Sequence, residues 1–210
     1  MSSGKPTPNK RDDIIQAALE LFGEHGIRAT TTRDIAARAG ITEGAIYRHF
    51  PSKEGLARGI FLDCMHRLLA HLQAAAAEGA TPGERLCSTA RAFFDFAEDT
   101  PAAYNYIMMS HQDDLPALMA QEIKPKDVFA QAIADGMAAG EFRRMDVQLA
   151  TGFVVGMCIR TVWFWSAGVL DLPRNEVGAE LCDAIHRILA PWRGPSTQVD
   201  DAFHTDKTCR

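Results

Sequence analysis

The amino-acid sequence predicts an all-α protein, and three observations support this fold class. Apolar residues recur at the spacing of helices that bury one face, for instance at Ile14, Ala18 and Leu21. Alternation of apolar and polar residues with a period of two, typical of strands, does not extend over any useful length. Pro and Gly separate the helical patterns. With 47% hydrophobic and 23% charged residues in 210 positions, the composition is that of a globular protein and excludes fibrous and low-complexity classes.

Two helices are expected at the N-terminal end of the chain. The first spans about residues 11–25 and stops at Gly26, because a glycine adopts the left-handed backbone that ends many helices. The second begins near Thr31 and ends at Gly40. Thr31 is a capping residue, and Asp34 stands three positions later, where a carboxylate favours the start of a helix.

A third short helix completes the spacing of a helix-turn-helix. It is expected over residues 42–49, with Thr42 as its cap and Ile46 and Phe50 facing the preceding helix. The last helix of such a motif enters the major groove of DNA, which is wide enough to admit one helix. Residues 1–58 carry nine basic and seven acidic side chains, although the whole chain has a net charge of −5. This end of the chain can therefore contact nucleic acid.

A dense, ordered series of residues covers this region. It consists of Arg11, Ile14, Ile15, Ala17, Ala18, Leu21, Phe22, Gly26, Thr31, Thr32, Arg33, Asp34, Ile35, Ala36, Ala39, Gly40, Ile41, Thr42, Gly44, Ala45, Ile46, Tyr47, His49, Phe50, Ser52, Lys53, Glu54 and Leu56. The series is similar to the DNA-binding domain of the tetracycline-repressor (TetR) family and covers about a quarter of the chain. The resemblance implies a one-component regulator, usually a repressor, that binds a palindromic operator as a homodimer.

The resemblance also implies which residues contact DNA. They are Thr31, Thr32, Arg33, Thr42, Glu43, Gly44, Ala45, Tyr47, Arg48, His49 and Lys53. Tyr47, His49 and Lys53 match positions that contact phosphates in the family. Tyr47 could instead fill the surface between helices, and His49 could hydrogen-bond within its own domain. Glu43 would be repelled by phosphates unless it accepts a hydrogen bond from cytosine N4 or pairs with Arg33 or Arg48. Arg48 could equally be a solvated side chain.

The remainder of the chain is expected to form a larger helical body, entered through one long helix over about residues 53–77. Pro82, Pro101 and Pro116 bound the helices that follow, and about nine helices result. The predicted division is a disordered arm (1–10), a DNA-binding domain (11–56), a ligand-binding and dimerisation domain (57–193) and a flexible tail (194–210).

Aromatic and methionine side chains concentrate between residues 93 and 165, and such side chains suit a pocket for a small hydrophobic or aromatic effector. Any one of them could instead be a core residue. The expected pocket residues are Phe93, Phe96, Tyr104, Met108, His111, Phe129, Phe153, Met157, Arg160 and Phe164. Arg160 lies in an otherwise apolar helix, where a buried charge needs a partner. That partner could be an anionic ligand, or Asp95 or Asp183.

The family resemblance further implies a homodimer formed through the last two helices, about residues 146–168 and 174–190. Glycines one turn apart permit close approach of two backbones, and the final helix carries an apolar stripe. The expected interface residues are Gly152, Gly156, Leu181, Ile185, Ile188 and Leu189. The two glycines could instead pack inside one subunit or widen a pocket.

Other classes of function are disfavoured. The sequence has no phosphate-binding loop, dinucleotide fingerprint, zinc-protease helix or serine-hydrolase elbow, so we expect no enzyme, cofactor or metal site. The five cysteines have no C-x-x-C spacing, which indicates a reducing, cytoplasmic location. Residues 149–170 are apolar enough to suggest a membrane span, but Arg160 near the middle favours a core or interface helix.

Two alternative functions remain open at this point. The first is a helical protein of the same fold that senses a ligand or a redox change without specific operator binding. The second is a transcriptional activator that uses the same operator geometry. Selection of a palindrome by the protein would exclude the first alternative. The position of the operator in the promoter determines whether the protein represses or activates transcription.

Overall fold

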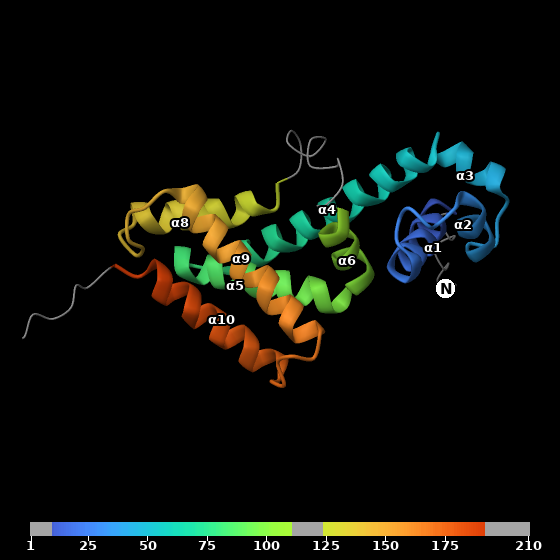
Figure 1. Cartoon of the computed structure of the whole chain (residues 1–210). Coiled ribbons are helices and arrows are strands. Elements are labelled where there is room, and N and C mark those ends of the chain that lie inside the picture. Colours follow the sequence, from blue (N-terminus) through green and yellow to red (C-terminus); the bar gives the residue numbers. More distant parts are fainter. Residues whose placement is uncertain (1–9, 111–123, 192–210) are drawn as a thin grey trace, which may run out of the picture.

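The computed structural model describes residues 10–110 and 124–191, and every regular element in these ranges is a helix (Figure 1). The helices are α1 (Lys10–His25), α2 (Thr32–Arg38), α3 (Glu43–His49), α4 (Lys53–Glu78), α5 (Pro82–Asp99), α6 (Pro101–Ser110), α8 (Lys126–Ala138), α9 (Val147–Ser166) and α10 (Arg174–Leu189). The predicted all-α fold is confirmed. The predictions for residues 1–9, His111 and 194–210 lie outside the described residues, and Lys10, expected in the arm, is the first residue of α1.

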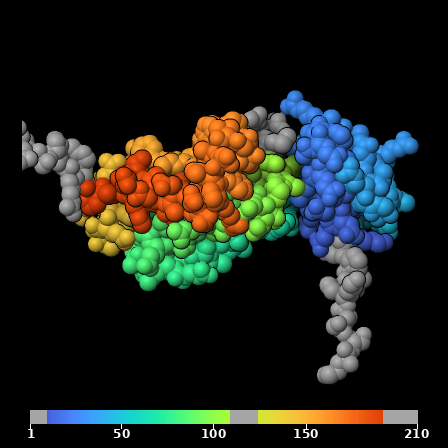
Figure 2. Space-filling model, turned by 90° about the horizontal axis from the view of Figure 1, so that it is seen from below, coloured from blue at the N-terminus to red at the C-terminus, as the bar shows by residue number. Residues whose placement is uncertain are grey.

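One long helix connects the two parts of the molecule. Figure 1 shows α4 running from the small α1–α3 unit into the body, where it packs along α5. Helix α5 is central, because it also contacts α6, α8, α9 and α10. Figure 2 shows the blue α1–α3 unit at one end and the orange and red helices α9 and α10 along one face of the body.

Caps and glycines set the bounds of the N-terminal helices. The Thr31 hydroxyl accepts a hydrogen bond from the Asp34 backbone N–H (3.2 Å), and the Asp34 carboxylate accepts one from the Thr31 N–H (3.0 Å). A further bond from the Thr31 hydroxyl lowers the pKa of Asp34. Gly26 and Gly40 have φ values of 80° and 65°, as expected of helix-ending glycines. Thr42 occupies the N-cap position of α3, but its side chain makes no capping hydrogen bond, so its predicted capping role is wrong.

The apolar core is continuous from the α1–α3 unit into the body. Ile14 and Ile46 are fully buried in the small unit, and Leu56, Ile60 and Leu72 of α4 carry the same cluster onward. Helix α4 therefore contributes buried residues to the core of both parts of the molecule.

Tyr106 of α6 joins the two parts. Its ring stacks on that of Phe22 in α1, with centroids 5.2 Å apart and planes 15° apart. Its hydroxyl donates a hydrogen bond to the carbonyl oxygen of Ala57 in α4 (2.9 Å). One buried side chain therefore contacts the α1–α3 unit, the connecting helix and the body.

A tight contact between Gly136 of α8 and the segment that follows this helix gives a first stability prediction. A Cβ atom at Gly136 would lie 2.2 Å from the ring of Phe142, which is itself buried. Gly136→Ala should therefore lower the free energy of unfolding by about 1–3 kcal/mol through overpacking. Gly23→Ala is the control, because its Cβ would meet nothing within 4 Å; it should stabilise the protein by up to about 1 kcal/mol. Urea denaturation measures both changes, and equal effects of the two substitutions would contradict the tight packing of Gly136 on Phe142.

Candidate functional site

Helix α3 is held on α2 by its apolar side and presents its polar side to solvent. Ile46 is completely buried against the core that includes Ile35 of α2. Ala45 is 8% exposed, so it faces the core and not DNA as predicted. Tyr47 is 47% exposed. Seven further residues that were predicted to contact DNA are also exposed: Thr31, Arg33, Thr42, Glu43, Gly44, Arg48 and His49. The exposed side of α3 can therefore approach the surface of another molecule.

A polar contact fixes the start of α3 on α2. The Thr32 hydroxyl donates a 2.6 Å hydrogen bond to Glu43 Oε1, and it lies 3.3 Å from the Tyr47 hydroxyl. Thr32 is only 8% exposed, so its side chain supports α3 and does not face DNA as predicted. The partner of Glu43 is this threonine, whereas the sequence led us to expect Arg33 or Arg48. A hydroxyl partner holds the carboxylate in place without cancelling its charge.

Basic groups surround α3, and two of them were missed by the sequence reasoning. Lys53 Nζ donates a hydrogen bond to the carbonyl oxygen of Arg28 (3.3 Å), which places the exposed Arg28 beside the start of α4. Lys10 lies with Arg48 and His49 around a cleft of about 300 Å³ between α1 and α3. Both missed residues are basic and lie close in sequence to a helix end, but only the fold brings Lys10 to α3 and Arg28 to the start of α4.

Arg38 is a basic residue of α2 that is already paired. Its guanidinium binds Glu24 (2.9 Å) and Glu20 (3.2 Å) of α1. The hydrogen bond from Arg38 lowers the pKa of Glu24, and the two carboxylates raise that of Arg38. This surface triad links α1 to α2, so we do not assign Arg38 to DNA.

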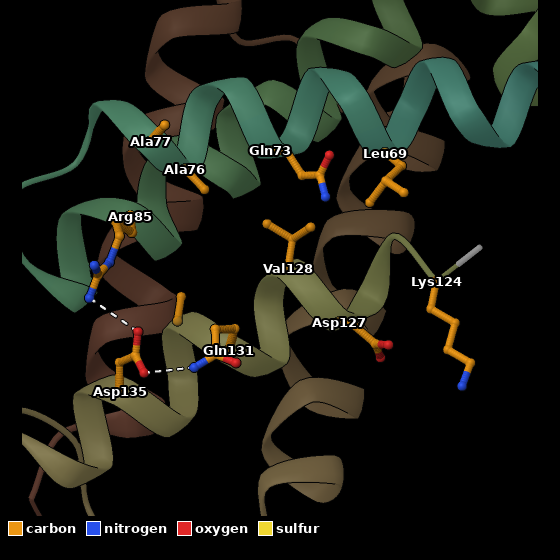
Figure 3. Close-up of a pocket in the computed structure, with 11 residues that line it drawn as sticks. Leu69, Gln73, Ala76, Ala77, Arg85, Lys124, Asp127, Val128, Gln131 and Asp135 are labelled. Atoms are coloured by element: carbon orange, nitrogen blue, oxygen red, sulfur yellow. Dashed lines mark hydrogen bonds and ion pairs between the residues drawn. The ribbon is translucent and has the colours of Figure 1, made fainter. Parts of the chain in front are cut away.

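The body contains a groove of about 670 Å³ between α4, α5 and α8 (Figure 3). Its apolar lining residues are Leu69, Ala76, Ala77, Val128 and Ala132, and its polar ones are Gln73, Arg85, Lys124, Asp127, Gln131 and Asp135. Asp135 accepts hydrogen bonds from Arg85 (3.3 Å) and Gln131 (2.8 Å). Arg85 Nε is buried without a hydrogen-bond partner. A groove of this size with mixed walls suits an amphipathic small molecule.

Of the residues predicted to bind the effector, none that the structure describes lines this groove. Phe93, Phe96, Tyr104 and Phe129 are at most 6% exposed and belong to the core, where Phe93 packs edge-to-face on Tyr104 at 5.9 Å. Met108 and Met157 are half-buried at the edge of the same core. The remaining described residues of the set are exposed on α9: Phe153, Arg160 and Phe164.

The prediction that Arg160 is a buried charge is wrong. Arg160 is exposed, and its guanidinium lies over the Trp163 ring, 5.2 Å from the centroid. The two carboxylates proposed as its partners bind other arginines. Asp95, together with Glu98, binds Arg174 at the start of α10, and Asp183 binds Arg187 one turn away (2.7 Å).

The outer face of α9 is an exposed apolar stripe. Its large members are 37–52% exposed: Leu149, Phe153, Trp163 and Phe164. Gly152 and Gly156 lie on the same face, and a Cβ on either would meet nothing within 4 Å, so packing inside the protomer does not require glycine there. Among the described residues, α9 is also the one helix long and apolar enough to span a membrane, and only 28% of its apolar window is buried. Such a stripe marks an interaction surface.

Helix α10 contributes less to that surface than the sequence suggested. Leu181, Ile185 and Leu189 are at most 5% exposed and pack into the core of their own protomer. They are therefore unavailable to a second copy, and their assignment to a subunit interface is corrected. Ile188 is half-buried. The apolar stripe of α10 faces inward because α5 and α9 already cover it.

The geometry defines a class of protein: a helix-turn-helix unit, joined by one helix to a separate helical body, is the organisation of a DNA-binding regulator. Two family models match the chain. "Bacterial regulatory proteins, tetR family" covers residues 14–60, and "Tetracyclin repressor-like, C-terminal domain" covers residues 79–189. The chain belongs to the TetR family of transcriptional regulators, as the residue series between positions 11 and 56 predicted.

Individual relatives agree over nearly the whole chain. The HTH-type transcriptional repressor KstR2 of Mycolicibacterium smegmatis is 31% identical over 183 residues, which is 82% of this chain and 86% of that protein. A tetR-family regulatory protein from Rhodococcus RHA1 has a TM-score of 0.75 and 27% identity, covering 88% of this chain and 98% of that one. The ketosteroid transcriptional regulator KstR2 of Mycobacterium tuberculosis has a TM-score of 0.69 and 26% identity, and the match covers 91% of this chain and 100% of that one. Transcriptional regulation through the helix-turn-helix is therefore confirmed.

Proposed function

We propose that the protein is a cytoplasmic repressor that binds a palindromic operator as a homodimer and is released by a small hydrophobic effector. The surface of α3 carries this proposal. Ile46 anchors the helix, and Thr42, Gly44 and Tyr47 are left free on the opposite side. The name of the KstR2 relative, a transcriptional repressor, favours repression over activation.

The surface of α9 and the size of α3 support a homodimer. One seven-residue helix makes few base contacts, whereas two such helices one DNA turn apart read both halves of a palindrome. The stripe that includes Phe153 and Trp163 is large and mostly apolar, with Arg160 lying over the Trp163 ring, and Gly152 and Gly156 permit close backbone approach. We therefore assign the subunit contact to the outer face of α9.

Selection of bound duplexes from a random library at fixed salt tests the operator assignment. The wild-type protein should enrich a palindrome, and Tyr47→Phe/Lys53→Ala should lose that enrichment. A sensor of the same fold without operator specificity would instead bind weakly, without sequence preference, and release at modest salt. Enrichment of no palindrome by folded protein, with or without candidate effectors, would refute the assignment.

Lys53 is expected to contribute one phosphate contact per protomer. Lys53→Ala should therefore weaken binding to all duplexes to a similar degree and reduce the slope of log affinity against log salt by about two for the dimer. Lys126→Ala is the matched control, because it removes an exposed lysine from the body. Fluorescence anisotropy over a salt series measures the slope, and an unchanged slope would remove Lys53 from the interface.

The groove between α4, α5 and α8 is the site that we propose for the effector. Leu69 and Gln73 on one wall belong to α4, whose first residue is Lys53 at the DNA-binding unit. A ligand that prefers one position of α4 therefore changes the spacing of the two α3 helices, and a coupling of about 1–3 kcal/mol is enough for release. The M. tuberculosis relative is named a ketosteroid regulator, which favours a polycyclic ketone as the first probe.

Filling the groove should prevent release without preventing operator binding. Gln73→Trp places a large side chain in the groove from an exposed position, and Ala70→Trp adds the same group to α4 outside the groove. Titration of the operator complex with steroid ketones and fatty acids should give a half-release concentration at least about tenfold higher for Gln73→Trp than for Ala70→Trp, which corresponds to about 1.4 kcal/mol. Equal values would place the effector elsewhere.

A further inference from the structure

Two cysteines from different helices meet where α5 packs against α10. The Cys182 thiol lies 3.8 Å from the carbonyl oxygen of Cys87 and donates a hydrogen bond to it. Cys87 and Cys182 are 9% and 6% exposed. Cys64 and Cys158 are more deeply buried, at 0% and 1%. The pair therefore lies just below the surface, whereas the other two described cysteines do not.

Polar side chains surround the pair. His186, one turn after Cys182, has its Nε2 atom 3.9 Å from Cys87 Sγ. Arg91, one turn after Cys87, is exposed and interacts with Cys182. Interaction with the Cys87 thiol, together with the nearby Arg91, lowers the pKa of Cys182, whereas interaction with Cys182 and burial raise the pKa of Cys87. Because the Arg91 guanidinium stabilises a thiolate on Cys182, we take Cys182 as the nucleophile of the pair.

We propose that Cys182 and Cys87 are a reactive thiol pair that a peroxide converts to a disulfide between α10 and α5. This modification site is independent of the proposed operator and effector sites, because no groove residue and no residue of the α1–α3 unit takes part in it.

The chemistry needs one molecule of peroxide for each pair. The Cys182 thiolate attacks one peroxide oxygen, the O–O bond breaks, and the products are a sulfenic acid and hydroxide (or an alkoxide), which takes a proton from solvent to become water (or an alcohol). The sulfur of Cys87 then attacks the sulfenic sulfur, the S–O bond breaks, and hydroxide leaves with the Cys87 proton as water. The two sulfurs lose two electrons in total and the peroxide gains them. Disulfide bond formation requires the sulfurs to approach to about 2.05 Å, so both side chains have to rotate.

Peptide mass spectrometry of the full-length, DNA-free protein after stoichiometric hydrogen peroxide tests the proposal. Two of the five thiols should disappear, one crosslinked peptide should contain Cys87 and Cys182, and dithiothreitol should restore both thiols. Cys158→Ser is the matched control and should form the same crosslink. Cys87→Ser should instead hold a sulfenic acid on Cys182 that a dimedone probe traps, which remains measurable even if the variant is less stable.

Three results would overturn the proposal. The first is retention of all thiols in folded wild-type protein under peroxide that oxidises a free thiol control. The second is a crosslink that uses another cysteine, with Cys87 and Cys182 left reduced. The third is equal labelling of Cys64 and Cys182 by dimedone in the Cys87→Ser variant, which would show that the neighbourhood of Cys182 confers no selectivity.

Discussion

Phe153→Asp is expected to convert the protein to a monomer and to lower operator affinity at least about 100-fold. The side chain lies in the apolar stripe of α9, where a second copy of the same face would bury it. An unpaired carboxylate in such a contact costs several kcal/mol, and the two-fold symmetry introduces it twice. A loss of about 3 kcal/mol in dimer stability is enough for a 100-fold effect on a site that both protomers must occupy.

Light scattering coupled to size-exclusion chromatography and anisotropy with the selected duplex measure the two effects. Ala184→Asp is the matched control, because it adds the same charge at an exposed position of α10 outside the stripe. That control should remain dimeric and bind normally. A dimeric Phe153→Asp protein with unchanged affinity would show that the subunits associate through another face.

Tyr106→Ala is expected to lower the free energy of unfolding by about 3–5 kcal/mol, the cost of deleting a fully packed aromatic side chain. The ring is 2% exposed and stacks on Phe22, so its loss opens a cavity at the junction between the α1–α3 unit and the body. Tyr106→Phe keeps the ring and removes only the hydrogen bond to Ala57, which should cost about 1 kcal/mol.

Urea denaturation of the two variants separates packing from hydrogen bonding at this junction. The Ala variant should also unfold in two steps if the α1–α3 unit depends on Tyr106 for its connection to the body. Similar stabilities of Tyr106→Ala and Tyr106→Phe would contradict the structural role of the ring stack.

The bounds of the N-terminal helices were predictable because local chemistry sets them. Thr31 and Asp34 satisfy each other's backbone and side-chain groups within four residues, and Gly26 and Gly40 adopt positive φ where the helices end. Such signals depend on neighbours in sequence only. The capping hydrogen bond predicted for Thr42 is absent, because a side chain that is able to cap a helix can also adopt a rotamer that makes no such bond.

The contacts around α3 were predictable only in part. The exposed side of α3 followed from the apolar positions Ala45 and Ile46, which face the core. The partner of Glu43 could not be predicted, because Thr32 is eleven residues away in the sequence and is brought to Glu43 by the packing of α2 on α3. Lys10 reaches the same surface from α1 through tertiary packing alone.

The body was less predictable, since composition does not distinguish a packed core from a ligand pocket. Phe93 and Tyr104 fill space between helices, whereas alanines and glutamines such as Ala76 and Gln73 leave the groove open. The apolar character of α9 extends around the helix, so its periodicity does not reveal which face is left exposed. Arg160 was taken as buried for the same reason.

Hydroxyl-radical footprinting of the wild-type protein on its selected duplex tests the central claim most directly. If two protomers joined through α9 each place α3 in the major groove, the footprint should show two protected blocks related by two-fold symmetry, with centres about one or two helical turns of DNA apart. The number of protomers bound per duplex, from light scattering of the same complex, should be even. A single unsymmetrical block bound by one protomer would contradict the claim.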